Sequence, residues 1–256
     1  MFIFGLGYTA KRIAAALARD GWEVVSTGRE GTLAFDDIGS VRAALADTVH
    51  VLSSVPPSAD GDPVLGAYGD ALGGKWLGYL SSTGVYGDTG GAWVDESAPT
   101  GTGRRTARAE ADAAWLALGA RVLRLPGIYG PGQSALERVE AGAAQRIDLP
   151  GQVFSRVHVD DIVSGFEQVL GACEGAYNLA DDHPTSQNAV IEEACRLLGR
   201  DPPPLVALDD AKLSPQARAF YAENRRVANG RAKRVLGWTP RYPSYREGLR
   251  ACLAAR

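Results

Sequence analysis

The amino-acid sequence predicts an α/β fold built on a doubly wound parallel sheet. Over the first 125 residues, short apolar segments alternate with longer segments of helical periodicity. Such alternation is typical of parallel sheets with helices on both faces. A glycine turn directly follows the first apolar segment. We expect a nucleotide-binding domain at 1–125 and, at 126–256, mostly a smaller C-terminal substrate lobe, with 156–181 returning to the core of the first domain.

The expected elements follow from apolar runs and from the residues that end them. Strands are expected at 2–4, 22–27, 33–35, 49–55, 76–82 and 121–125, and helices at 11–19, 41–46 and 104–118. Gly21 follows the first helix, where a left-handed residue commonly ends a helix, and Pro126 ends the last strand. Beyond it the pattern becomes turn-rich. Two helices, 160–170 and 186–198, and a strand at 177–180 are expected there.

Composition limits the classes of partner. The chain has 256 residues and a formal net charge of −3, so it has no basic field that would attract nucleic acid or an anionic membrane. Its three cysteines are far apart and lack CxxC spacing, which favours free thiols in a reducing compartment. We expect a cytoplasmic protein that acts on a small molecule. The oligomeric state stays open, a homodimer included.

The glycine turn is the main sign of a cofactor. Gly5, Gly7 and Ala10 fit the pattern G-x-G-x-x-A between a strand and a helix. The glycines let a pyrophosphate approach the backbone, and the helix N-terminus offers free N–H groups, as in Rossmann-type domains. Tyr8 and Thr9 belong to the same turn. Ser53, near the end of the fourth expected strand, is assigned to the same cofactor site.

The end of the second strand indicates which dinucleotide binds. NAD enzymes place an acid there, whereas this chain reads Ser-Thr-Gly-Arg and ends on Arg29. A guanidinium pairs with the 2′-phosphate of NADP through two hydrogen bonds. The sequence therefore favours NADP over NAD, although a solvated surface arginine is the alternative.

Two further patterns are rejected. Residues 69–75 fit most of a phosphate loop, but Trp76 replaces the Ser or Thr that would hold magnesium, and a strand follows where one should precede. His158 lies close to Asp160 and Asp161, yet a metal needs at least three converging ligands. One of the two aspartates is expected to cap a helix that begins at Ile162. No metal site is predicted.

A set of motifs in fixed order carries a family resemblance. They lie at 5–10, 80–88, 123–132, 156–161, 177–181 and 234–249. Together they resemble the extended and atypical short-chain dehydrogenases, often labelled NAD-dependent epimerase/dehydratase. The resemblance spans nearly the whole chain and is specific for the fold, but much less so for the substrate.

The resemblance implies roles for several residues. Ser82 or Thr83 would lie beside the nicotinamide and hold the reacting oxygen by a hydrogen bond. Tyr86 would line the substrate side of the pocket, with core packing as an equal alternative. Arg225 and Arg226 match loosely the region where family members bind the phosphates of nucleotide sugars, and a solvated helix face is equally open.

One part of the family pattern is missing. The family carries Tyr-x-x-x-Lys one helix after the active-site strand, but residues 100–115 contain neither residue type. If Asp112 matches the acid that follows the lysine, Arg104 and Arg108 stand in the two positions. If Glu110 matches it, Thr102 and Thr106 do. Arg108 is expected to bind ribose or phosphate, but arginine stays protonated and carries no proton.

Another group must then move the proton, if any does. The titratable candidates near family pocket segments are Tyr86, Asp88, Asp95, Glu96, Tyr129 and His158. Tyr86 is the best of them because it directly follows the active-site strand, and Arg104 or Arg108 would have to lower its pKa.

Two functions follow from this pattern. One is an NADP-dependent oxidoreductase or epimerase that acts on a small carbonyl, an alcohol or a nucleotide sugar. The other is a catalytically silent NADP-binding sensor or scaffold. An open cleft beside Ser82 favours the first, and a cleft plugged by side chains favours the second.

Overall fold

The computed structural model describes residues 1–103 and 106–256, and its centre is a parallel sheet of six strands. Across the sheet, the order is β10 (Gly175–Asn178), β6 (Arg121–Leu125), β4 (Trp76–Ser82), β3 (His50–Ser53), β1 (Phe2–Phe4) and β2 (Val25–Ser26). All pairings are parallel, so the carboxyl ends of the strands meet at one edge. The predicted doubly wound α/β fold is confirmed.

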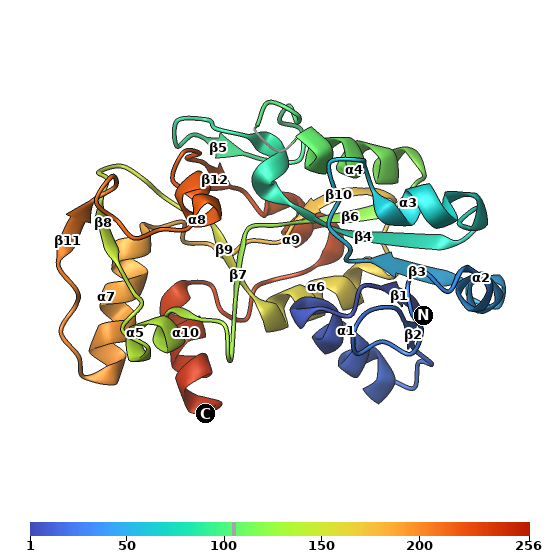
Figure 1. Ribbon diagram of the computed structural model, residues 1–256, viewed down its shortest axis with the longest axis horizontal. Helices are drawn as coiled ribbons and strands as arrows, with labels where there is room; N and C mark the ends of the chain where they lie inside the picture. Colours follow the sequence, from blue (N-terminus) through green and yellow to red (C-terminus); the bar gives the residue numbers. More distant parts are fainter. Residues whose placement is uncertain (104–105) are drawn as a thin grey trace.

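Helices cover both faces of this sheet (Figure 1). On one face lie α1 (Tyr8–Arg19) and α6 (Val159–Val169), and on the other lie α2 (Ile38–Ala46), α3 (Pro63–Tyr68) and α4 (Thr106–Ala117). The alternation of β1 explains the two layers, because Ile3 joins the core of the first face while Phe2 and Phe4 join that of the second.

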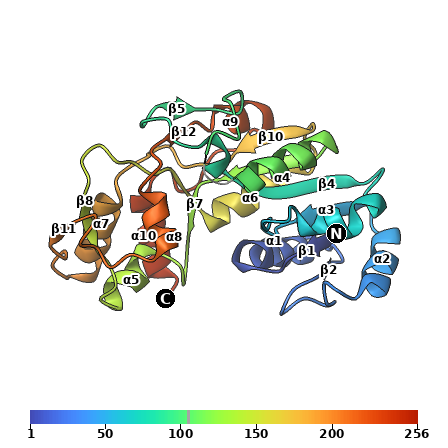
Figure 2. The same ribbon diagram turned by 45° about the horizontal axis from the view of Figure 1, so that its top comes forward.

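A second, smaller core lies beyond the carboxyl ends of the strands, separate from the sheet (Figure 2). It is built by α5 (Ala135–Glu140), α7 (Gln187–Leu198) and α10 (Tyr245–Ala254), with β8 (Arg146–Asp148), β11 (Leu205–Ala207) and α8 (Pro215–Phe220) alongside. Residues of β9 (Arg156–His158), α6 and β10 belong to the sheet core instead, as do Ala232 and Leu236 of α9 (Gly230–Leu236).

Two short pairs of parallel strands join segments that are distant in the sequence. The first joins β7 (Gly127–Tyr129) to β9 (Arg156–His158), and the second joins β5 (Trp93–Val94) to β12 (Arg226–Val227). A 3₁₀ turn, η2 (Thr83–Tyr86), directly follows β4.

The strand expected at 33–35 does not form. Only an isolated bridge joins Thr27 to Leu33, because the outer edge of β2 is already occupied. The Thr32 hydroxyl accepts a hydrogen bond from the Ser26 N–H (3.0 Å) and donates one to the Ser26 carbonyl (3.1 Å). The Leu33 N–H also donates to the Ser26 carbonyl (3.0 Å), but the Ser26 N–H is taken by the Thr32 side chain, so the contact stays a single bridge and no ladder forms.

The expected cap of α6 is also wrong. This helix begins at Val159, and His158 is its N-cap, with Nδ1 accepting a hydrogen bond from the Asp160 N–H (3.2 Å). Asp161 is buried and accepts hydrogen bonds from the N–H groups of Arg241 (2.6 Å) and Tyr242 (3.2 Å). Its carboxylate therefore fixes the loop before α10.

None of the helices in the described part of the chain is long and apolar enough to cross a membrane. The three cysteines are free, with Cys173 exposed and Cys195 and Cys252 buried. The cytoplasmic location stays a prediction.

Candidate active site

The glycine turn after β1 presents an open helix N-terminus. Gly5 has φ +81°, and its N–H donates a hydrogen bond to the Thr27 hydroxyl (3.2 Å), which ties the turn to the end of β2. Gly7 is exposed, and a Cβ added there would meet no atom within 4 Å. It caps α1 through its backbone alone, with no acid in the first turn. The first N–H groups of α1 are therefore free for an anion such as a pyrophosphate.

The other expected cofactor residues differ in orientation. Ala10 and Thr9 are buried under the turn, and Arg29 is exposed beyond β2. The Tyr8 hydroxyl donates a hydrogen bond to the Pro131 carbonyl (3.2 Å), so its side chain contacts protein. Ser53 is fully buried, and its hydroxyl accepts a hydrogen bond from a backbone N–H two residues later. The Tyr8 and Ser53 side chains therefore bond to protein, while the Tyr8 backbone N–H belongs to the open first turn of α1.

A cavity of about 800 Å³ lies between the sheet and the smaller core. Ser82 and Thr83, at the carboxyl end of β4, form its inner wall, as the resemblance implies. The Ser82 hydroxyl accepts a hydrogen bond from the Gly84 N–H (3.1 Å), and no acceptor in the described chain takes its proton. This hydroxyl is thus available to donate to a ligand oxygen. Most of the remaining wall comes from the C-terminal half and includes Ile128, Tyr129, Phe154, Arg156, Val190, Phe220, Tyr221, Arg225, Tyr245 and Leu249.

The helix α4 supports the first of the two registers for the missing pair. Asp112 is buried and forms a two-point ion pair with Arg124 of β6, at 2.7 and 3.1 Å, and accepts a hydrogen bond from Ser81 (2.6 Å). A structural acid at this position leaves Arg108 in the lysine position, where its guanidinium donates to the Tyr79 hydroxyl (3.1 Å). Arg104, in the tyrosine position, lies outside the described residues.

Tyr86 does not face the cavity. Its hydroxyl donates to the Asn178 side chain (2.8 Å) and accepts from Arg124 (3.0 Å), and the side chain is 1% exposed. Burial raises the pKa of this phenol above its ordinary value, in spite of the Arg124 charge beside it. The neighbouring cation is Arg124 rather than Arg108, because the 3₁₀ turn directs Tyr86 toward β6 and β10. The geometry therefore argues against Tyr86 as the proton carrier.

Of the other candidate proton carriers, only Tyr129 lines the cavity, and burial raises the pKa of its phenol. Glu96 accepts a hydrogen bond from the Asn178 N–H (2.7 Å), and Asp95 accepts from Ser97. Asp88 accepts from the Asn224 N–H (2.8 Å). The His158 ring caps α6 and lies 3.6 Å from the Cys252 sulfur, and burial lowers the pKa of the imidazole.

The two arginines expected to bind substrate lie apart. Arg225 lines the cavity, donates to the Gly87 carbonyl (2.6 Å) and pairs with Glu223 (2.8 Å). Arg226 donates to the Gly91 carbonyl and is not part of the cavity wall, so its guanidinium holds the β5 loop rather than a ligand. This geometry does not favour Arg226 as a substrate-binding residue, and that role stays a prediction.

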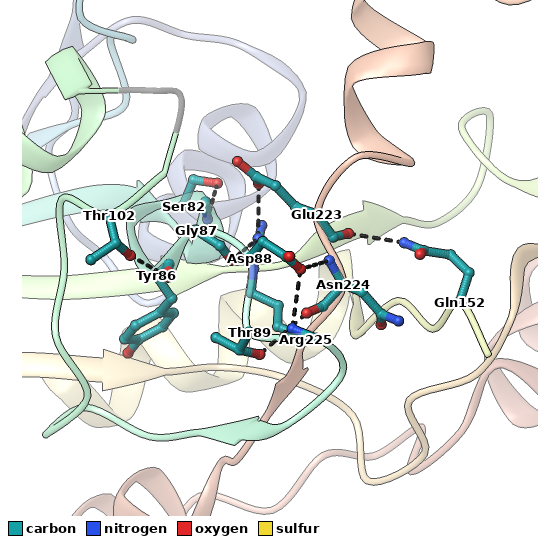
Figure 3. Close-up of polar contacts among 12 residues, drawn as sticks. Ser82, Tyr86, Gly87, Asp88, Thr89, Thr102, Gln152, Glu223, Asn224 and Arg225 are labelled. Carbon is teal, nitrogen blue, oxygen red and sulfur yellow. Dashed lines mark hydrogen bonds and ion pairs between the residues drawn. The ribbon is translucent and has the colours of Figure 1, made fainter.

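Figure 3 shows how residues 223–225 join the loop that follows η2. Asp88 accepts the Asn224 N–H, the Thr89 hydroxyl donates to the Asn224 carbonyl (3.2 Å), and Arg225 reaches Gly87. The Gln152 side chain donates to the Glu223 carbonyl from the opposite side (2.9 Å). These bonds fix one wall of the cavity over the end of β4.

Sequence reasoning missed Arg156, the most deeply buried cation of the cavity wall, with 6% exposure. The available signal was its position, because this arginine opens the motif at 156–161 and is directly followed by the apolar Val157. Asp181, from the motif at 177–181, lies behind it, with its N–H donating to the Arg156 carbonyl (2.7 Å). Its Oδ2 has no hydrogen-bond partner in the described chain.

Burial raises the pKa of Asp181 from its ordinary value of 3.8 to about 7. The folded state therefore holds a proton between about pH 4 and pH 7 that the unfolded state releases, so stability falls as the pH rises through this window. The full effect is roughly 4 kcal/mol at most. We expect Asp181→Asn to flatten this slope between pH 4.5 and pH 7.5 in urea unfolding, while the exposed Asp209→Asn leaves it unchanged. Asp161, whose pKa burial raises to about 6, keeps part of the slope in the variant.

One solved structure matches along the whole chain. It is described as that of a functionally unknown conserved protein from Silicibacter pomeroyi, and it is 40% identical, with a TM-score of 0.88. The match covers 99% of this chain and 98% of the other. The chain belongs to the family of this protein. No protein-family model matches the chain.

More distant matches show the fold of this family. The dTDP-glucose 4,6-dehydratase of Bacillus anthracis, solved with NAD, has a TM-score of 0.76 at 16% identity and covers 99% of this chain and 96% of its own. The UDP-glucose 4-epimerase of Thermus thermophilus, also solved with NAD, has a TM-score of 0.74 at 19% identity over the full length of both chains. The predicted resemblance to the epimerase/dehydratase type is confirmed at the level of the fold.

A curated relative matches part of the chain. It is a 3-diazoavenalumate denitrifying reductase from Streptomyces, 32% identical over 140 residues. These residues are 50% of this chain and 45% of the relative, so the match spans about half of either protein.

Proposed function

We propose that the protein is an NADP-dependent oxidoreductase or epimerase that acts on a small carbonyl or alcohol substrate in the cavity beside Ser82 and Thr83. The observation that carries this proposal is the cavity itself. It measures about 800 Å³, lies at the carboxyl edge of a parallel sheet and is not plugged by side chains. An open cleft beside Ser82 favours an enzyme over a silent protein.

The chain's residues fit a nicotinamide dinucleotide. The open N-terminus of α1 at Gly7 suits the pyrophosphate, and the exposed Arg29 suits a 2′-phosphate. Glu30 follows it, but its carboxylate is already paired with Lys11 of α1. When bound, the cofactor supplies or accepts hydride. The enzymes of similar fold that were solved with NAD support a dinucleotide at this edge.

Ser82 is the residue to which we assign a direct role in the reaction. Its free hydroxyl proton donates to the carbonyl oxygen, and the half-buried position of Ser82 beside the cavity limits competition from water. Tyr86 is a positioning residue that holds Arg124 and Asn178 behind η2. The relative named a reductase supports reduction over epimerisation. Nucleotide sugars remain a substrate class suggested by fold alone.

A silent NADP-binding sensor is the second candidate. Among the described residues of α4 there is no tyrosine and no lysine, and Arg108 is bonded to Tyr79. Turnover of NADPH with a panel of aldehydes, ketones and nucleotide sugars decides between the two. Reproducible turnover excludes the silent protein, and tight NADPH binding without turnover excludes the enzyme.

The cofactor preference is tested by Arg29→Ala. We expect NADPH binding to weaken about 10- to 100-fold because a charge-assisted hydrogen-bond pair to the 2′-phosphate is lost, while NADH binding stays the same. Fluorescence titration with both cofactors measures this. Arg19→Ala, an exposed arginine at the other end of α1, is the matched control and should change neither. Equal binding of NADPH and NADH by the unmodified protein would contradict the preference for NADP.

A further inference from the structure

The cavity wall contains a buried cation without a carboxylate partner. Arg156 donates hydrogen bonds to the carbonyls of Phe154 (2.9 Å) and Thr185 (3.0 Å) and to the Gln187 side chain (3.0 Å). No carboxylate within the described chain approaches its guanidinium to 4 Å, although Asp181 lies close enough to interact at longer range. Neutral partners orient the guanidinium but leave its charge uncompensated. A buried charge of this kind is costly unless a counter-charge joins it.

The other charged side chains of the cavity wall are paired with an opposite charge or solvated by water. Arg225 is paired with Glu223 at 2.8 Å, and Glu137 is paired with Arg256 at 3.0 Å. Arg138 is exposed, so water already solvates it. Arg156 is therefore the cation in this wall that would gain most from an anion inside the cavity. One such cation suits a single negative charge better than the several charges of a diphosphate.

The rest of the wall is aromatic and aliphatic. The guanidinium of Arg156 lies 5.9 Å from the centre of the Phe154 ring, and this ring meets Tyr221 edge-on at 5.4 Å. Tyr245 and Phe220 extend the surface. Flat rings bind between such side chains through stacking and edge contacts. The cavity thus combines a largely aromatic and aliphatic wall with one buried, oriented cation.

We propose that the substrate of this cavity is a small aromatic carboxylate, with its carboxylate on Arg156 and its reacting carbon directed at Ser82. The inference deepens the proposed function and rests on it, because it takes the cavity as the substrate site. It differs from the nucleotide sugars named for the structures of similar fold.

Matched acids and amides test the charge. Benzoate, 4-phenylbutanoate and 2-naphthoate are titrated by calorimetry against the NADPH-loaded protein, each beside its neutral amide. UDP serves as the probe for a nucleotide. At least one acid is expected to bind about 10- to 100-fold more tightly than its amide because its carboxylate makes charge-assisted bonds to Arg156. Equal affinity of every acid and its amide would overturn the proposal, as would UDP binding without any acid.

Two variants locate the effect. Arg156→Gln should abolish the preference for the acid and leave amide binding unchanged, whereas Arg156→Lys should keep part of it. Arg138→Gln, at an exposed arginine of the same wall, is the control and should keep the full preference. If Arg156→Gln does not fold, Arg156→Lys and the acid–amide comparison in the unmodified protein still decide. A preference that persists undiminished in Arg156→Lys and in Arg156→Gln would place the carboxylate elsewhere.

NADPH titration of the same samples separates this inference from the proposed function. Intact NADPH binding with no acid preference overturns the aromatic carboxylate alone. If the protein binds neither NADPH nor NADH, the acids are titrated without cofactor, and acid binding that depends on Arg156 then supports the ligand class and overturns the oxidoreductase.

Discussion

Replacing Asp112 with alanine should lower the free energy of unfolding by about 3–5 kcal/mol. Asp112 and Arg124 form an ion pair whose side chains are 1% and 4% exposed. Without the carboxylate, the guanidinium stays buried between β4, β6 and α4, where the Tyr86 hydroxyl is its one remaining side-chain hydrogen-bond partner among residues 1–103 and 106–256. The loss of a counter-charge in such a position costs far more than the loss of a surface pair. Urea unfolding followed by circular dichroism measures it.

Asp70→Ala is the matched control for this prediction. Asp70 pairs with Arg42 through two hydrogen bonds (2.8 and 3.0 Å), but both side chains are largely exposed, so about 1 kcal/mol or less should be lost. The double variant Asp112→Leu with Arg124→Met should recover most of the stability that Asp112→Ala loses, because it removes both buried charges. Equal losses for Asp112→Ala and Asp70→Ala would show that the buried pair does not stabilise the fold.

Much of the sheet could be predicted because its signals are local. β4 and β6 have the predicted bounds, 76–82 and 121–125, since each has an apolar centre and ends at a turn or a proline. Whether residues 33–35 form a strand depends instead on which groups form hydrogen bonds with the outer edge of β2. The Thr32 hydroxyl takes the Ser26 N–H at that edge, and no propensity of residues 33–35 reveals it.

The candidate site was predictable in part for the same reason. Ser82 and Thr83 reach the cavity because they end a strand at the edge where ligands bind. Tyr86 follows them closely in sequence, but the direction of its side chain is set by Asn178 and Arg124, which lie far along the chain. Arg156 was missed because its candidate role depends on the absence of a nearby carboxylate in the folded chain, which the sequence does not show. Local sequence patterns do not predict which distant segments come into contact and which do not.

Ser82→Ala should lower kcat about 10²- to 10³-fold and leave NADPH binding unchanged. The Ser82 hydroxyl is the group at the end of β4 whose proton has no acceptor within the described chain, so it is preorganised for the oxygen that gains charge during hydride transfer. Because this hydrogen bond strengthens as the charge develops, its loss should appear in kcat more than in KM. Steady-state kinetics with the best carbonyl substrate, beside an NADPH titration, separate the two effects.

Ser81→Ala is the matched control, since Ser81 is the preceding residue and points to the opposite face of β4. Its hydroxyl donates to the buried Asp112 (2.6 Å), so the variant should lose about 1 kcal/mol of stability and keep its kcat. The pair of variants thus assigns chemistry to one face of a strand and stability to the other. If Ser82→Ala keeps full turnover while Ser81→Ala loses it, the oxygen-binding group lies on the Asp112 side, and the cavity beside Ser82 is not where the reaction occurs.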